Sequence, residues 1–349
     1  MIRFLHLNFN AVVVSLVLIL ATTFLAGCDK PVEAIKISGP TMGTSYNITL
    51  YPTKGVSKSL DSKQIQQQID ESLKRINQQM STWIEDSEIS LFNKSQSTDW
   101  YPISAEFAHV VEAAQSISQL SNGAFDITIG PLINIWGFGK DFKNNNPDDA
   151  TIASAKKSIG YQKLDVRLSP PALRKQIPQL QINLSAIAKG YGVDAIAEQL
   201  AAAKVNDYLV EIGGEIRANG AKPNKSLWRI AIEKPSTKER SIQQGLLLEN
   251  TGVATSGDYR NYFERDGKRY SHTIDPETGK PITHTLASVT ILNKSAMMAD
   301  GFATAIMVLG ETKAKAFIAD NKLSAYIVSR NKDGFSNWHN FSDTKLIKP

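Results

Sequence analysis

The chain has 349 residues, of which 42% are hydrophobic, and a formal net charge of +5, so it has the composition of an ordinary globular protein with a sizeable core. The basic residues are scattered and form no tract interleaved with aromatics, so we expect no nucleic-acid partner. The single cysteine, at position 28, excludes a disulfide framework, a cysteine-ligated zinc site and thiol catalysis in the folded body.

The first 28 residues have the order of a secretory signal. Arg3 supplies a positive start, residues 11–20 form an apolar run broken only by Ser15, and small residues lead to Cys28. The alternative interpretation is a transmembrane helix, because residues 11–27 approach the shortest spanning length. The position of the cysteine favours export. The segment resembles the signal of bacterial lipoproteins, in which Cys28 is acylated and becomes the mature N-terminus.

The lipoprotein resemblance has consequences for organisation and location. It implies a signal peptide at 1–27 and a lipidated tether at 28–35, and we expect one domain at 36–349 because nothing later in the chain resembles a linker. In such signals an aspartate directly after the cysteine, here Asp29, retains the protein in the inner membrane. We therefore expect a lipid-anchored protein on the periplasmic face of the inner membrane.

Hydrophobic periodicity predicts the elements of the body in chain order. Ile65, Ile69, Leu73, Ile76 and Met80 recur every three to four residues and predict one amphipathic helix. The full set is a strand pair at 37–51 interrupted at 39–40 and 43, helices at 61–80 and 104–123, a polar loop at 140–149, short strands within 164–184, a helix at 185–203, strands at 208–212, 228–232 and 243–248, a hairpin at 259–274 turning at 266–267, a strand at 287–292, helices at 296–309 and 312–320, and a last strand at 323–328.

Strands and helices alternate irregularly, many strands are joined by tight turns, and no repeat is visible. This pattern predicts an α+β fold, a single mixed domain with largely antiparallel sheets and packed helices.

Two short segments near the start of the body are too rich in small residues to be ordinary packing elements. In residues 41–44, Thr-Met-Gly-Thr, the glycine indicates a strand bulge or the close approach of another group, and a bulge is favoured on these residues alone. In residues 123–126, Gly-Ala-Phe-Asp, a helix end presents Asp126 at a turn. That carboxylate could hold a hydroxyl-rich ligand such as a ribose, or it could simply form an aspartate turn.

The segment 183–192 opens a helix with a lysine, Lys189, and two glycines in its first turns. Helix N-termini bind phosphate through unpaired N–H groups and the helix dipole, so an anion site is one interpretation, although neither a Walker A loop nor a dinucleotide fingerprint is present.

Asp300 and Thr304 lie four residues apart on an apolar helix and therefore share one face. They could bind Mg²⁺, or Asp300 could equally be a buried carboxylate bonded to the backbone.

His272 precedes an Asp-Pro turn and by itself is more often structural than catalytic, and no histidine has metal-ligand spacing.

Eight motifs in order make a more specific pattern. They are residues 41–44, residues 80–83 with 86–88 and Asn93, residues 123–126, residues 188–194, residues 213–215, residues 256–259, residues 272–281 and residues 300–304. This order resembles the ApbE family, bacterial FAD:protein FMN transferases that are often lipoproteins, over about residues 39–331.

The resemblance implies a role for each matching residue. The residues implied to surround FAD are Met42, Trp83, Ala124, Phe125, Asp126, Asn183, Lys189 and Ile274. Those implied to hold Mg²⁺ are the Ala186 carbonyl, Asp300 and Thr304, with Ala303 beside them. Asn183 departs from the family, which usually has aspartate there.

The implied reaction moves the FMN half of FAD onto a Thr or Ser hydroxyl of another protein and releases AMP. His272 is our candidate base because its ordinary pKa, about 6.5, suits the task. Asp258 and Asp275 are the next candidates. The family's acceptors are subunits of membrane-bound, ion-pumping NADH and ferredoxin oxidoreductases. Two alternatives remain: an FAD pyrophosphatase that uses water and yields FMN and AMP, and a flavin-binding lipoprotein without catalysis.

Overall fold

The computed structural model describes residues 33–52, 61–139, 146–236, 241–259, 262–265 and 268–348. Cys28 and most of the predicted tether lie outside these residues, as do part of the polar loop and the predicted hairpin turn at 266–267. Residues 34–349 cluster as one compact unit. None of the helices in the described ranges combines the length and apolarity that a bilayer crossing requires.

The helices are α2 (Ser62–Met80), α3 (Glu88–Lys94), α4 (Ala105–Leu120), α5 (Gly130–Ile135), α6 (Asp149–Lys157), α7 (Ala188–Ala202) and α8 (Ala296–Asp320). The strands are β1 (Ile35–Thr41), β2 (Thr44–Tyr51), β3 (Tyr101–Pro102), β4 (Leu164–Leu168), β5 (Pro171–Lys175), β6 (Asp207–Ile212), β7 (Glu215–Asn219), β8 (Trp228–Glu233), β9 (Ile242–Leu248), β10 (Thr251–Gly257), β11 (Tyr262–Arg265), β12 (Lys268–Ser271), β13 (Ile274–Asp275), β14 (Lys280–Pro281), β15 (Leu286–Asn293), β16 (Ser324–Asn331), β17 (Gly334–His339) and β18 (Leu346–Ile347).

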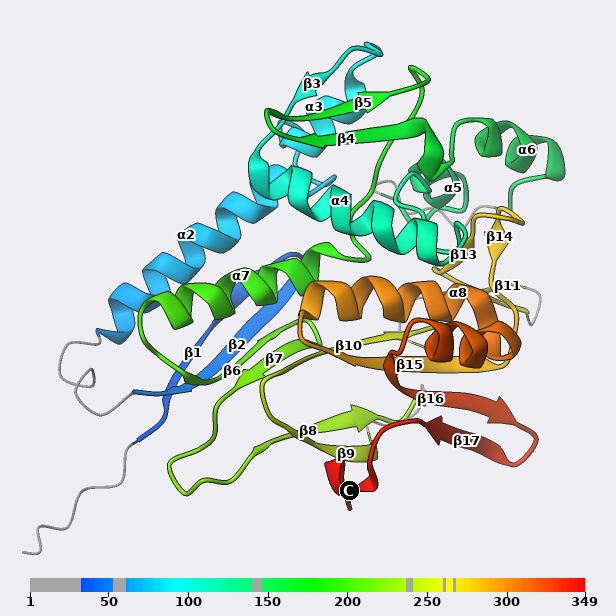
Figure 1. Ribbon diagram of the computed structural model, residues 1–349. Helices are drawn as coiled ribbons and strands as arrows, with labels where there is room; N and C mark the ends of the chain where they lie inside the picture. Colours follow the sequence, from blue (N-terminus) through cyan, green and yellow to red (C-terminus); the bar gives the residue numbers. More distant parts are fainter. Residues whose placement is uncertain are drawn as a thin grey trace, which may run out of the picture. The chain divides into compact units, whose positions relative to one another are not determined.

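An eight-stranded sheet in the order β1-β2-β6-β7-β10-β15-β16-β17 forms the centre of the fold, and each of its pairs is antiparallel. Helices α7 and α8 cover one face, and the small sheet β18-β9-β8 covers the other (Figure 1). Because both faces are covered, β15 is buried along nearly its whole length. The predicted α+β class with largely antiparallel sheets is confirmed.

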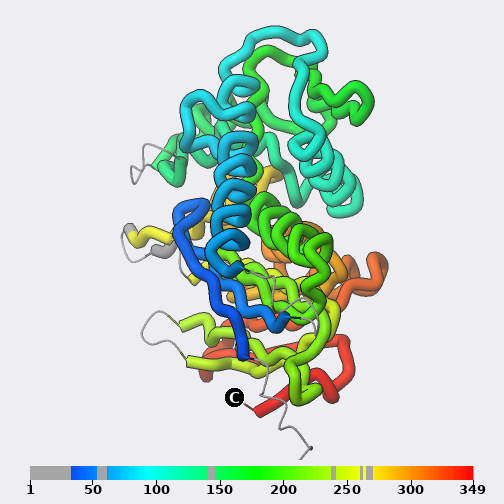
Figure 2. The backbone as a smooth tube through the Cα atoms, turned by 90° about the vertical axis from the view of Figure 1, so that its left-hand side faces the viewer, coloured from blue at the N-terminus to red at the C-terminus, as the bar shows by residue number. Residues whose placement is uncertain are grey.

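The long helices begin where the sequence offers a capping side chain. Asp61 caps α2 by accepting from the Lys63 N–H, and Ser104 caps α4 by accepting from the Phe107 N–H. The α2 stripe buries against β1, β2 and α7, and Figure 2 shows α2 running beside α7. The Ser72 hydroxyl donates to Gln199 Oε1 at 2.9 Å and joins the two helices.

Three local expectations were wrong. The Gly39-Pro40 pair does not interrupt the first strand but lies within β1, which is an edge strand and tolerates a proline without an N–H. The break predicted at Gly43 is confirmed, but Met42 and Gly43 both have positive φ (49° and 71°), which is the backbone of a two-residue hairpin turn rather than the bulge that was favoured. The predicted helix at 185–203 begins only at Ala188.

Several elements were not predicted, among them the helices α3, α5 and α6 and the strands β3, β7, β10, β14, β17 and β18. The last helical region was predicted as two helices, and the chain does break there: Gly310 has φ 72° and ψ 169° inside α8.

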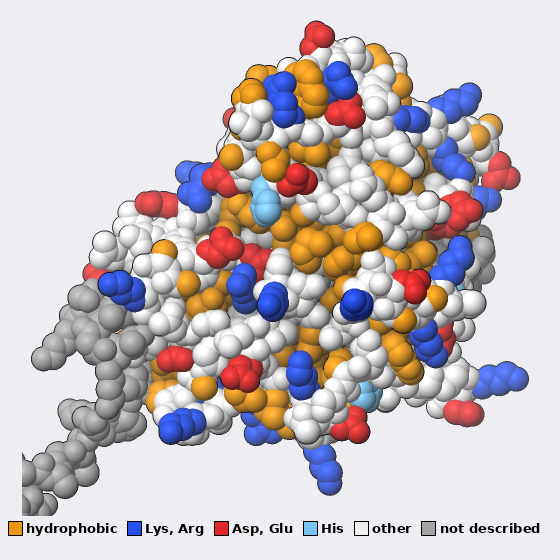
Figure 3. Space-filling view, in the orientation of Figure 1, with side chains coloured by type: hydrophobic (Ala, Val, Ile, Leu, Met, Phe, Trp, Pro, Cys, Tyr) orange, Lys and Arg blue, Asp and Glu red, His pale blue; other side chains and the backbone are white. Residues whose placement is uncertain are grey.

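On the face drawn in Figure 3, basic and acidic side chains are interspersed over the surface.

Candidate active site

A cavity of about 1240 Å³ lies where the segments between the main elements converge. Its wall comes from the turn after α2, the segments 124–139 and 181–189, the β6–β7 turn, the end of β10, the β12–β13 link and the face of α8. Twelve of the residues singled out from the sequence lie on this wall: Met42, Trp83, Ala124, Phe125, Asp126, Asn183, Ala186, Lys189, His272, Ile274, Asp300 and Thr304.

Three predicted residues do not lie on the wall. Ala303 is fully buried behind it on α8. Asp258 forms a two-point ion pair with Arg330, with nitrogen–oxygen distances of 2.7 and 2.5 Å. Asp275 accepts from the Glu277 N–H in the turn that follows β13. Because neither carboxylate faces the cavity, the proposal of a catalytic base rests on His272.

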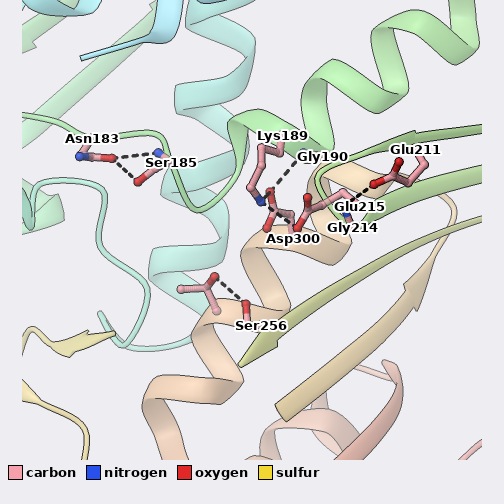
Figure 4. A network of polar contacts seen from close by, with 10 residues as sticks. Asn183, Ser185, Lys189, Gly190, Glu211, Gly214, Glu215, Ser256 and Asp300 are labelled. Atoms are coloured by element: carbon pink, nitrogen blue, oxygen red, sulfur yellow. Dashed lines mark hydrogen bonds and ion pairs between the residues drawn. The ribbon is translucent and has the colours of Figure 1, made fainter. Parts of the chain in front are cut away.

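Helices α7 and α8 are locked together at the cavity. The Gly190 N–H in the first turn of α7 donates to Asp300 Oδ2 at 3.1 Å (Figure 4). Gly190 is needed because a Cβ at this position would lie 2.7 Å from the Ala296 carbonyl carbon and from Met297 Cα. This close approach brings Lys189 and Asp300 onto one wall.

Asp194, one turn further along α7, holds the start of α8. Its carboxylate accepts from Ser295 Oγ at 2.6 Å and from the Ala296 and Met297 N–H groups at 3.0 Å. Arg217 on β7 completes the set at 2.7 Å. A carboxylate at a helix N-terminus satisfies unpaired N–H groups and interacts favourably with the dipole. Each helix therefore caps the other, which fixes their relative position.

Lys189 lies between two carboxylates. Its Nζ is 2.8 Å from Glu215 Oε1 and 3.9 Å from Asp300 Oδ2. Burial raises the pKa of Glu215 and of Asp300 above ordinary carboxyl values, and the Lys189 charge opposes both shifts. Burial alone would lower the pKa of Lys189, but the two carboxylates outweigh it and the pKa is raised. Lys189 is therefore a cation on the cavity wall.

The free N–H groups expected at the start of this helix are mostly in use. The Ala188 N–H donates to the Leu184 carbonyl at 2.8 Å, and the Gly190 N–H is taken by Asp300. Our hypothesis that this helix end binds phosphate through its backbone is therefore weakened. The positive charge here comes from the Lys189 side chain.

Two other polar side chains of the cavity wall already accept hydrogen bonds from the protein. Asp126 forms an aspartate turn: one oxygen accepts from the N–H and hydroxyl of Thr128, and the other from the Tyr161 N–H. Asn183 Oδ1 accepts from the Ser185 N–H at 2.9 Å and hydroxyl at 2.5 Å. Since a backbone N–H only donates, the Asn183 oxygen must face Ser185, and the amide nitrogen is the group left for a ligand.

Two larger apolar side chains, Trp83 and Met42, line the cavity. Trp83 is 61% exposed although it lies on the wall. Met42 is held in the strained positive-φ region by the hairpin turn, and its side chain packs against Gly192 of α7. An exposed aromatic ring at a cavity mouth can stack on a planar ring of a ligand.

His272 lies between β12 and β13, with its ring edge-on to Phe138 at a centroid distance of 6.5 Å.

On α8, Thr304 shares a hydrogen bond of 3.1 Å with Ser256 of β10, and both line the cavity. Asp300 and Thr304 thus project from one face, as the four-residue spacing predicts.

Glu215 and Asp194 belong to two of the eight motifs, but the sequence predicted no role for either. Glu215 starts a strand after two glycines, and Asp194 lies on the buried face of α7. A charged residue among buried positions requires a partner, and this signal could have identified both.

The chain is similar to proteins of a known family. The model of the ApbE family matches residues 42–327. The chain belongs to the ApbE family. It is 44% identical to the FAD:protein FMN transferase of Vibrio cholerae over 93% of this chain and 96% of that protein. It is 37% identical to the protein of the same name from Escherichia coli K12, over 92% and 93% of the two chains.

Solved ApbE structures have the same fold. The flavin transferase ApbE from Vibrio cholerae superposes with a TM-score of 0.83 at 42% identity, covering 91% of this chain and all of that one. The flavinyl transferase ApbE of Pseudomonas stutzeri gives 0.81 at 38% identity, over 89% and 95%. The family resemblance inferred from eight motifs is confirmed.

Proposed function

We propose that this chain is an FAD:protein FMN transferase, which moves the FMN half of FAD onto a Thr or Ser hydroxyl of another protein and releases AMP. Family membership and the names of its relatives support this activity. The observation that carries it is the meeting of Lys189, Asp300 and Thr304 with the flavin-side residues on the wall of one cavity.

The reaction forms one bond and breaks one. The acceptor oxygen bonds to the phosphorus of the FMN half, the bond from that phosphorus to the bridging oxygen breaks, and AMP leaves with the bridging oxygen. Lys189 lies where it would neutralise the negative charge that grows on the phosphate oxygens. His272, on the same wall, takes the proton of the attacking hydroxyl.

The residues present suit a magnesium ion. No group of three or more His, Cys, Asp or Glu side chains able to hold a metal occurs among the described residues, but Mg²⁺ needs only one or two carboxylates together with substrate phosphates. The Ala186 carbonyl and the side chains of Asp300 and Thr304, with Ala303 behind them, would hold it. The ion would supply positive charge to the pyrophosphate being cleaved.

Seven further residues of the cavity wall are proposed to contact the flavin nucleotide. Trp83, Met42, Ala124, Phe125 and Ile274 offer apolar surface. Asp126 and Asn183 offer polar groups, and the Asn183 amide would donate where the family's usual aspartate would accept.

We also propose a lipid anchor at Cys28 and a location on the periplasmic face of the inner membrane. The signal-like start of the chain supports this proposal. On the face of the protein drawn in Figure 3, basic and acidic side chains are interspersed, so this face has no concentrated positive charge that would bind a membrane. Attachment to the membrane would therefore depend on the lipid at Cys28. Such a location would suit acceptor subunits of membrane-bound NADH or ferredoxin oxidoreductases.

One incubation tests the activity. The protein is mixed with FAD, Mg²⁺ and a peptide containing Ser-Gly-Ala-Thr, and the products are separated by mass. Transfer predicts a peptide heavier by FMN and one AMP for each FAD consumed. Free FMN with AMP and unmodified peptide would indicate an FAD pyrophosphatase, and unchanged FAD would indicate a binding protein without catalysis. A peptide with Val in place of Thr serves as the control.

A further inference from the structure

Glu215 is a buried carboxylate on the cavity wall. It opens β7 directly after Gly213 and Gly214, which both have positive φ and reverse the chain between β6 and β7. The residue is 3% exposed, yet it belongs to the cavity lining together with Lys189 and Asp300 (Figure 4).

The two oxygens of Glu215 differ in their surroundings. Oε1 receives the Lys189 ammonium at 2.8 Å. Oε2 is buried and finds no hydrogen-bond partner among the described residues. An ionised oxygen without a partner is costly inside a protein, so a site that keeps one commonly awaits a ligand.

The charges of this cluster do not balance. Glu215 and Asp300 are two carboxylates, and among the described residues Lys189 is the cation that lies beside both, at 2.8 and 3.9 Å. With both carboxylates ionised, the cluster carries one uncompensated negative charge in a buried position. A divalent cation beside it would correct the balance, and a carboxylate oxygen is a ligand that Mg²⁺ prefers.

We propose that Glu215 belongs to the cation site and uses Oε2 to hold the divalent ion together with Asp300 and Thr304, as a ligand or through a water of the ion's shell. This inference rests on the magnesium site of the proposed function. It adds a third oxygen side chain, contributed by β7, to the two that α8 provides.

The competing role is that Glu215 only orients Lys189. The two roles predict that substitution of Glu215 weakens the binding of different ligands. A residue of the cation site affects metal affinity even when Lys189 is absent, whereas a residue acting through Lys189 affects only the binding of the phosphates that Lys189 would contact.

Mn²⁺ binding, followed by electron paramagnetic resonance on the full chain without FAD, separates them. Glu215→Gln keeps the size and removes the charge, and we expect Mn²⁺ affinity to fall about 10- to 100-fold. Glu215→Asp keeps the charge and should retain part of the affinity. Glu211→Gln is the matched control, because Glu211 lies close by on β6, outside the cavity lining, with both oxygens bonded to Gly214 and Asn47.

The same titration in a Lys189→Met background completes the test. The effect of Glu215→Gln should persist there, and its disappearance would show that Glu215 acts through Lys189. Unchanged Mn²⁺ affinity in Glu215→Gln, with Asp300→Asn strongly impaired, would overturn the inference and leave the proposed function standing. Unchanged affinity in Asp300→Asn, or no Mn²⁺ binding by the unmodified protein even when FAD is present, would overturn the magnesium site itself. Thermal melting of each variant confirms that it is folded.

Discussion

The close packing of α7 on α8 makes Gly190→Ala a sharp test of the site. The added Cβ would lie 2.7 Å from two backbone carbons of α8 and closer still to the Ala296 carbonyl oxygen. Ordinary contact begins at 3.4 Å, so the helices must separate by roughly 0.7 Å or more. Backbone atoms cannot rotate away as a flexible side chain would.

The effects on stability partly cancel, while those on activity do not. Overpacking costs about 1–3 kcal/mol of unfolding free energy, and alanine regains about 1 kcal/mol of helix propensity over glycine. The displaced groups, however, are Lys189 and Asp300, which would lie beside the reacting phosphate in the proposed reaction. Since a misplacement of about 1 Å can cost about 100-fold in rate, we expect transfer at saturating FAD to slow about 10- to 100-fold.

The assay is AMP release at saturating FAD, together with thermal melting. Gly130→Ala is the control for folding, because its Cβ would meet nothing closer than 3.7 Å. Gly190→Ala should melt at a temperature only slightly below that of the unmodified protein, and yet it should release AMP more slowly. A folded Gly190→Ala protein with a normal rate would refute the argument that α7–α8 spacing sets the geometry of the site.

Three further changes test other parts of the chain. His272→Ala should slow transfer about 10²- to 10⁴-fold at saturating FAD with little change in the FAD dissociation constant; a normal saturated rate would remove His272 as the base. Burial lowers the pKa of Lys175 to about 8 in the folded protein, so the unfolded chain binds this proton more tightly than the folded protein does. The free energy of unfolding should therefore rise as the pH increases from about 8 towards the ordinary pKa of lysine. Lys175→Met should lack this rise in denaturant melts, and identical pH dependence in both proteins would contradict the shift. Cys28→Ala should keep its activity in solution but leave the membrane fraction, whereas continued fractionation with membranes would contradict lipidation.

The order of the motifs was enough to assign the family, and local patterns were enough for the long helices. The apolar stripe of α2 and the capping residues Asp61 and Ser104 specify where α2 and α4 begin, because periodicity and capping act within one or two turns of chain. The four-residue spacing of Asp300 and Thr304 likewise placed both on one face of α8. These inferences need no knowledge of distant residues.

The sequence was a poor guide to strands that show neither alternating apolar and polar residues nor a continuous apolar run. β10 is buried over its first half and meets the cavity at its end, so no alternation of apolar and polar residues is visible. β17 is an edge strand in which no residue is buried, and its polar residues resemble a loop. Strand prediction depends on such an alternation or on a continuous apolar run like that of β15, and β10 and β17 have neither.

The partners of the charged residues were decided only by the tertiary structure. Asp300 meets Gly190 across 110 residues, and Asp194 reaches the start of α8 across about 100. No local pattern encodes these pairs, because each depends on how α7 and α8 pack on the sheet. The sequence by itself determined which chemical groups are available, their order and the family. The packing of α7, α8 and β7 decided that Lys189 has two carboxylate neighbours and that Glu215 keeps one oxygen without a partner, because buried charges must find their partners wherever the fold brings them.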